Sequence, residues 1–90
     1  MALVDFLAYK MGCSYISDLR DVRARGQAYI HRLSRVITNI KAENHSLGEW
    51  NDMLEYLFSA PAESSVKDAK ERALSLLADQ APEASQAASF

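Results

Sequence analysis

The sequence predicts an all-α protein, a compact bundle of four to five short helices followed by a mobile C-terminal tail. Apolar residues recur at intervals of three and four along most of the chain, which is the spacing of one helical face. Residues that favour helices are abundant, whereas only three glycines and two prolines occur in 90 residues. Neither Asn-Gly or Asp-Gly hairpin turns nor strict alternation of apolar and polar residues, the marks of a sheet, occur in the sequence.

The first predicted helix covers residues 2–11. Leu3, Leu7 and Met11 recur at intervals of four and therefore lie on one helical face. Gly12 follows directly and predicts the end of this helix, because glycine adopts the left-handed backbone conformation of a helix C-terminus without strain.

A second, shorter helix is predicted from residue 15 to about residue 21. Ser14 is the expected N-cap, with Ser17 as an alternative, because a serine hydroxyl accepts a hydrogen bond from a free N–H group of the first turn. Ile16 and Leu19 are three residues apart, and both are expected in the core.

Residues 21–26 predict a break or a kink. Gly26 costs a helix interior about 1 kcal/mol relative to alanine, so it disfavours one continuous helix through this stretch. Two alternatives stay open: either Gly26 ends a short helix, or Asp21 caps a new helix that tolerates the glycine.

The longest helix is predicted over residues 27–42. Ile30, Leu33, Ile37 and Ile40 follow intervals of three, four and three, which form a single core-facing stripe. Only a short turn separates this helix from the next one along the chain. We therefore expect these two helices to be antiparallel neighbours or an angled pair.

The next helix, predicted over residues 46–58, has the clearest pattern in the chain. Ser46 and Glu49 are spaced as a capping box, in which each side chain reaches the free backbone N–H of the other residue. Its apolar face contains the single tryptophan and consists of Leu47, Trp50, Met53, Leu54, Leu57 and Phe58.

A last helix is predicted after Pro61, since proline disfavours helix in the residue before it. Ser64 or Ser65 is the expected N-cap, and Asp68 is placed to complete an acidic capping box with Ser65. The apolar face of this helix consists of Val66, Ala69, Ala73, Leu76 and Leu77.

These helices are expected to form a single domain over residues 1–79. Residues 80–90 are predicted to be a flexible tail, because small polar residues bury too little apolar surface to offset the entropy of ordering. The core is predicted to contain Leu7, Ile16, Leu19, Ile30, Leu33, Ile37, Ile40, Trp50, Leu54, Leu57, Leu74 and Leu77.

The composition favours a cytoplasmic protein with no membrane partner. The net charge of −2 predicts neither a nucleic-acid nor an anionic membrane partner. Cys13 is the single cysteine, which excludes an intramolecular disulfide and suits a reducing compartment. The N-terminus does not read as a secretory signal, and no apolar run approaches the ~20 residues that span a bilayer.

Charge is divided unevenly along the chain. Residues 18–45 hold six basic and three acidic residues, whereas residues 46–90 hold three basic and eight acidic residues. Arg25, Arg32 and Arg35 form a candidate basic face for phosphate backbones. The favoured interpretation is a solvated face that pairs with the acidic half of the same molecule.

The two best-predicted helices superficially match a helix-turn-helix. The second helix would have to enter the major groove of DNA. It carries Glu49, Asp52 and Glu55 and no lysine or arginine, so a polyanion would repel it. The simplest DNA-reading arrangement is therefore excluded.

The sequence contains no constellation that predicts enzymatic chemistry. Cys13, His31 and His45 have no recognised metal-ligand spacing, so we expect no metal and no cofactor. A cysteine nucleophile would need a base and an oxyanion site in a cleft, which a short helical bundle offers little room for. We expect a protein that is not an enzyme.

The function predicted from the sequence is protein interaction or a structural role, with a homodimer as one form of it. The candidate partner surface consists of Trp50, Met53 and Phe58, on the condition that the bundle leaves part of this group uncovered. The alternative is a nucleic-acid-binding accessory protein that uses the Arg25, Arg32 and Arg35 face.

Overall fold

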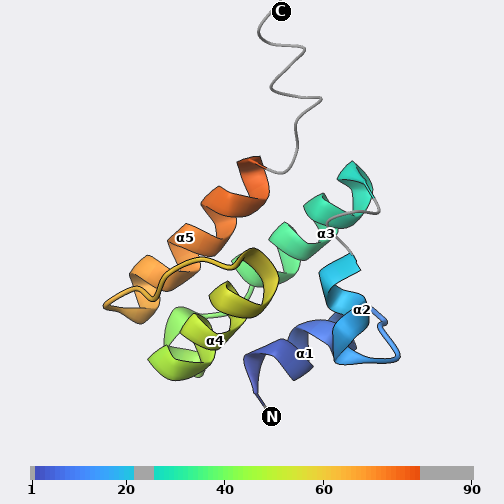
Figure 1. Ribbon diagram of the computed structural model, residues 1–90. Helices are drawn as coiled ribbons and strands as arrows, with labels where there is room; N and C mark the ends of the chain where they lie inside the picture. Colours follow the sequence, from blue (N-terminus) through green and yellow to red (C-terminus); the bar gives the residue numbers. More distant parts are fainter. Residues whose placement is uncertain (1, 22–25, 80–90) are drawn as a thin grey trace, which may run out of the picture.

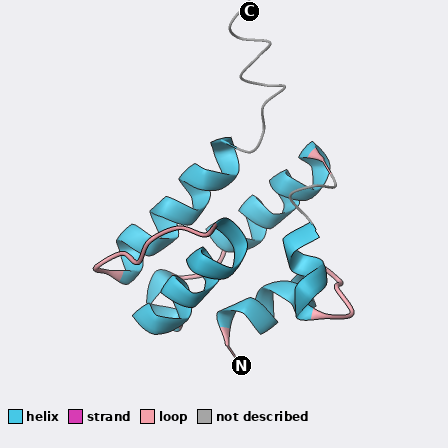
Figure 2. Ribbon diagram, in the orientation of Figure 1, coloured by secondary structure: helices cyan, strands magenta, loops and turns pink. Residues whose placement is uncertain are grey.

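The structure is a computed structural model that describes residues 2–21 and 26–79. These residues form five α-helices and one short 3-10 helix, and Figure 2 shows no strand among them. The all-α prediction is therefore confirmed. The tail predicted at 80–90 lies outside the described residues. In chain order the elements are α1 (Leu3–Lys10), α2 (Ile16–Asp21), α3 (Gln27–Thr38), η2 (Ala42–Asn44), α4 (Leu47–Phe58) and α5 (Val66–Asp79).

Helices α1 and α5 hold the bundle together (Figure 1). Helix α1 contacts α2, α3 and α4, whereas α5 contacts α3, α4 and η2. The predicted pairing of α3 with α4 is wrong, because these two helices are bridged by α1 and α5 and do not pack extensively on each other. Helix α3 ends at Thr38, earlier than the predicted residue 42, so the connection to α4 is longer and contains η2.

Local sequence signals explain where most helices begin and end. Gly12, just after α1, has a φ of 73°, and Gly26, just before α3, has a φ of 108°, so both occupy conformations that other residues rarely adopt. Gly26 occupies the cap position of α3, at the end of the predicted break interval 21–26, of which residues 22–25 lie outside the described residues. Ser59 has a φ of 53° and ends α4. The Ser65 hydroxyl accepts a hydrogen bond from the Asp68 N–H at 3.1 Å, which identifies Ser65 as the cap of α5.

The cap predicted for α2 is wrong. Helix α2 begins at Ile16, which places Tyr15, rather than Ser14 or Ser17, at the cap position. The Tyr15 N–H donates to the Asp18 carboxylate at 3.2 Å. The free N–H group is therefore satisfied by an acid in the first turn, which is the returning half of a capping box.

One core lies between the helices, and most of its predicted members are buried. Two predicted members are exceptions: the Ile16 side chain is 40% exposed, and Leu74 is half-buried. Leu19, one turn after Ile16 in α2, is fully buried. The buried residues absent from the predicted list are Leu3, Ala8, Met11, Met53, Ala69 and Ala73.

The two buried alanines explain how α5 joins the bundle. Ala69 and Ala73 are one turn apart and have no exposed surface. Small side chains at this spacing let the backbone of α5 approach α3 and α4 closely.

In the described part of the chain, no helix combines the length and apolar character needed to span a bilayer.

Candidate interaction surfaces

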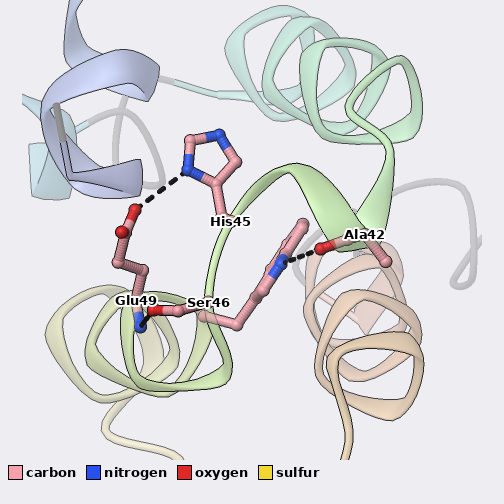
Figure 3. A network of polar contacts seen from close by, with 5 residues as sticks. Ala42, His45, Ser46 and Glu49 are labelled. Atoms are coloured by element: carbon pink, nitrogen blue, oxygen red, sulfur yellow. Dashed lines mark hydrogen bonds and ion pairs between the residues drawn. The ribbon is translucent and has the colours of Figure 1, made fainter.

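The structure buries most of the partner surface that was predicted on α4. Trp50 and Met53 have no exposed surface, and Phe58 is half-buried. The Trp50 indole N–H donates to the Ala42 carbonyl at 2.8 Å, so its polar atom is satisfied inside the molecule (Figure 3). The condition for a partner surface at Trp50 and Met53 is therefore not met, because both side chains are fully covered within the bundle.

His45 joins the start of α4 to α1. Its ring Nδ1 lies 2.9 Å from Oε1 of Glu49 (Figure 3). Its ring centroid lies 5.8 Å from that of Phe6 in α1. The hydrogen bond with His45 lowers the pKa of Glu49 below its ordinary value of 4.5. The Glu49 carboxylate is thus ionised near neutral pH, and Nδ1 of His45 carries the proton that it donates.

The capping box predicted for α4 is half formed. The Ser46 hydroxyl accepts a hydrogen bond from the Glu49 N–H at 3.2 Å. The Glu49 carboxylate contacts His45, and a hydrogen bond with the Leu3 backbone also lowers its pKa. The Glu49 carboxylate therefore links α4 to His45 and to Leu3, the first residue of α1. These contacts take the place of the reciprocal capping bond to the Ser46 N–H that the sequence predicted.

Two further side chains hold loops by their backbone groups. Asn51 donates its amide N–H to the Glu63 carbonyl at 3.1 Å and accepts from the Glu63 N–H at 2.9 Å. Lys70 donates to the carbonyls of Thr38 at 3.1 Å and Ile40 at 2.6 Å, beyond the last turn of α3. A cation at a helix C-terminus satisfies free carbonyls and complements the helix dipole.

The candidate basic face lies on the outer side of α3. Arg25 is outside the described residues, whereas Arg32 and Arg35 are exposed. The ion pair found among the described residues joins His45 to Glu49 and involves neither arginine. In this part of the chain the arginines therefore do not pair with the acidic half. The favoured interpretation of the charge pattern predicted such pairing.

Two other cations lie over aromatic rings. The Lys10 ammonium is 5.5 Å from the centroid of the Phe6 ring, and the Arg20 guanidinium is 5.3 Å from that of Tyr56. The first contact follows one turn of α1, whereas the second joins α2 to α4. Charge in this protein is thus placed against aromatic surface as well as against carboxylates.

The three residues considered for metal or thiol chemistry are not brought together into a metal site. His31 is exposed on α3, while Cys13 and His45 are partly buried in separate connections. Among residues 2–21 and 26–79, no three histidine, cysteine or carboxylate side chains converge as metal ligands would.

Large apolar side chains are exposed near the end of α1 and the start of α2, where the sequence predicted no site. Tyr9 is 71% exposed, Tyr15 is 73% exposed and Ile16 is 40% exposed. We call these three residues the Tyr9–Ile16 surface. Tyr9 lies off the apolar stripe of α1, which is the signal in the sequence that points to its exposure.

Two cavities follow one flank of α3, facing α1 and the turn after it. The first, of about 290 Å³, is lined by residues that include Gly12, Ser14, Asp18 and Arg32. The second, of about 260 Å³, is lined by Phe6, Lys10, Val36, Asn39 and Ile40. Arg32 and Val36 are one helical turn apart, so the cavities lie next to each other along α3. We call them together the α1–α3 groove.

A third cavity, of about 400 Å³, lies between η2 and α5. Lys41, Glu43, Lys67 and Glu71 are among its lining residues. All four side chains are exposed, and Lys70 also lines the cavity. The Lys70 ammonium already donates to the Thr38 and Ile40 carbonyls.

Comparison of the chain with protein-family models, with curated proteins and with solved structures gives no match. Function is therefore argued from the geometry of the surfaces described above. The Tyr9–Ile16 surface and the α1–α3 groove are the two features that burial and cavity shape single out.

Proposed function

We propose that this chain is a protein-interaction module that binds its partner through the Tyr9–Ile16 surface. The observation that carries the proposal is the exposure of Tyr9, Tyr15 and Ile16 within one short stretch of a chain whose other large apolar residues, where described, are mostly covered. Exposed apolar patches mark interaction sites in soluble domains, and tyrosine is enriched among the residues that dominate binding energy.

The energetic argument concerns apolar area that folding leaves in water. Full burial of a large aliphatic side chain stabilises a complex by roughly 1.5–3 kcal/mol relative to exposure. A tyrosine adds rigid apolar area and a hydroxyl that can pair at the rim of an interface. A partner that covers the Tyr9–Ile16 surface therefore gains stabilisation that this chain alone does not realise. A cytoplasmic location belongs to the same proposal, and it is supported by the cysteine content.

A second copy of the chain is the first partner to test. Light scattering after size exclusion should give a mass above the 10.0 kDa of one chain if the surface pairs with itself. The combined Tyr15→Ser and Ile16→Ser variant should then return to the monomer mass. A monomer at high micromolar concentration rules out the homodimer and leaves a different protein as the partner.

Proximity labelling in the native host tests the general proposal. Wild type, a Tyr9→Ser, Tyr15→Ser and Ile16→Ser variant, and a Lys67→Ser control are compared. Lys67 is exposed on α5, away from this surface in the sequence. We expect the triple variant to lose specific neighbours that the control retains, with equal helix content by circular dichroism. If the triple variant keeps the same neighbours, the proposal is overturned.

The exposure of Arg32 and Arg35, without an ion pair in the described part of the chain, favours nucleic-acid binding as a second candidate function. Binding through these arginines would release counterions and weaken steeply with salt. Fluorescence anisotropy with labelled single- and double-stranded oligonucleotides at low and raised salt tests this. Equal signals from wild type and from Arg32→Gln with Arg35→Gln would eliminate the second candidate.

A further inference from the structure

We infer that the α1–α3 groove takes an acidic peptide segment of a protein partner, with one apolar side chain seated between Phe6 and Val36. This inference rests on the proposed interaction function and names the chemistry of the partner. It uses residues that the Tyr9–Ile16 surface does not contain. The groove and that surface adjoin, because Lys10 follows Tyr9 and Ser14 precedes Tyr15 in the chain.

The size of the cavities favours single side chains as occupants. Pockets that enclose a drug-sized ligand measure roughly 300–1,000 Å³. The two cavities here measure about 290 Å³ and about 260 Å³, and they are neighbours along α3. A pair of small adjacent cavities suits consecutive side chains of a peptide better than one compact molecule.

The second cavity has an apolar floor. Phe6 and Val36 are half-buried, and Ile40 retains only 7% of its surface. Phe6 belongs to α1, Val36 belongs to α3, and Ile40 lies in the turn after α3, so the floor is built by separate parts of the bundle. An apolar side chain of a partner gains burial there without displacing any part of this chain.

The charge around the groove is positive. Lys10 lines the second cavity and Arg32 lines the first, while Arg35 is exposed one residue before Val36. Asp18 is the acidic residue of the lining, and its carboxylate accepts a hydrogen bond from the Tyr15 N–H at 3.2 Å. Carboxylates of a partner therefore meet two cations at the rim, which supplies steering and register.

The same features favour a peptide over a nucleic acid. A single strand of nucleic acid requires a continuous basic track with aromatic faces open for stacking. In the groove, Asp18 lies in the same lining as Arg32, and the Phe6 ring has the Lys10 ammonium 5.5 Å from its centroid. An apolar floor with separated cations matches alternating acidic and apolar side chains.

A peptide titration of the isotope-labelled full chain, followed by NMR, tests the inference. The probe is a short peptide of alternating Glu and Ser with one central Leu. We expect saturable shift changes at Phe6, Lys10, Arg32 and Val36, and an affinity that falls as salt rises. Reversing both rim charges, as Lys10→Glu with Arg32→Glu, should weaken binding about ten-fold or more, because attraction becomes repulsion.

Matched controls make the outcome decisive. The Lys41→Glu and Lys67→Glu variant reverses two exposed lysines at the cavity between η2 and α5 and should bind like wild type. A peptide with Ser in place of Leu tests the apolar seat, and one with Lys in place of Glu tests the charge. The inference is overturned if either altered peptide binds as tightly as the original peptide. It is also overturned if the control variant weakens binding as much as Lys10→Glu with Arg32→Glu does.

Two other outcomes also overturn it. One is the absence of saturable shifts at the groove, and the other is tighter binding of a single-stranded oligonucleotide to the same residues. Failure of the titration is distinct from failure of the proposed function. If labelling still depends on Tyr9, Tyr15 and Ile16, the interaction surface stands and only the acidic peptide is rejected.

Discussion

Helices α2 and α4 each begin with one half of the capping box, and yet they differ in how much of their apolar surface is buried. In α4 the Ser46 hydroxyl accepts from the Glu49 N–H, and in α2 the Asp18 carboxylate accepts from the Tyr15 N–H. Among the described residues, α4 contacts α1, α2 and α5, whereas α2 contacts α1 and α4. The comparison teaches that a cap determines where a helix starts, whereas the surrounding elements determine how much of it is buried.

The two regions also differ in how they satisfy polar groups. Around α4, the indole of Trp50, the imidazole of His45 and the amide of Asn51 all have partners within the molecule. At α2 the tyrosine of the cap position is 73% exposed. The α4 region is thus internally complete, whereas the α2 region keeps apolar area available to another molecule.

The largest expected effect is that of Trp50→Ala. The side chain is fully buried and its N–H is bonded to Ala42, so truncation leaves a large cavity and a carbonyl without its partner. We expect a loss of about 3–5 kcal/mol in the free energy of unfolding, measured by urea denaturation. Trp50→Phe, which keeps most of the apolar volume, is the control and should lose less. A change below about 1 kcal/mol for Trp50→Ala would contradict the internal completeness of the α4 region.

A smaller effect is expected from Asn51→Ala. Its amide forms both hydrogen bonds that hold the Glu63 backbone, so the variant leaves two partly buried backbone groups unpaired. We expect a loss of about 1–3 kcal/mol in unfolding free energy. The neighbouring Asp52→Ala variant changes an exposed residue and should stay within about 0.5 kcal/mol of wild type. Equal effects of the two variants would show that the Asn51 bridge contributes nothing.

The contribution of Glu49 should depend on pH. Its pKa is lowered in the folded chain, chiefly by the hydrogen bond with His45, from an ordinary value of 4.5. A group whose pKa is lower in the folded chain than in the unfolded chain stabilises the fold when the pH is above the unfolded pKa. This stabilisation is lost as the pH falls through the folded pKa. The melting temperature of wild type minus that of Glu49→Gln should therefore be largest above pH 4.5 and shrink on acidification. Glu55→Gln on the exposed face is the control, and a pH-independent difference for Glu49 would refute the linkage.

The smallest expected effect on stability is that of Ile16→Ser. The side chain is 40% exposed, so the substitution removes less burial than one at a core residue. We expect a loss of about 1 kcal/mol, read by the same urea titration. Leu19→Ala in the same helix is the matched variant and should cost about 2–5 kcal/mol, because Leu19 is fully buried. A large loss for Ile16→Ser would mean that the α2 region is part of the core.

Periodicity was sufficient to predict α3, α4 and α5 and the stripe of Ile30, Leu33 and Ile37, because a long amphipathic helix has one way to hide its apolar face. It failed for Ile16, since the spacing of Ile16 and Leu19 does not reveal which of the two side chains the other helices cover. It also failed for Met53, which was expected to help form a surface and is fully buried. The candidate groove was out of reach, because its walls come from separate helices.

The sequence by itself determined the helices, the caps Ser46 and Ser65, and the glycines that flank α1 and α3, since these depend on interactions between residues a few positions apart. Only the tertiary structure decided which apolar side chains are covered. Trp50 is hidden because η2 brings the Ala42 carbonyl to its indole, and α3 and α4 are separated because α1 and α5 lie against both. The physical reason is that burial is a property of neighbours in space. The apolar pattern of one helix predicts which of its faces is suited to burial. It does not predict whether neighbouring elements bury that face.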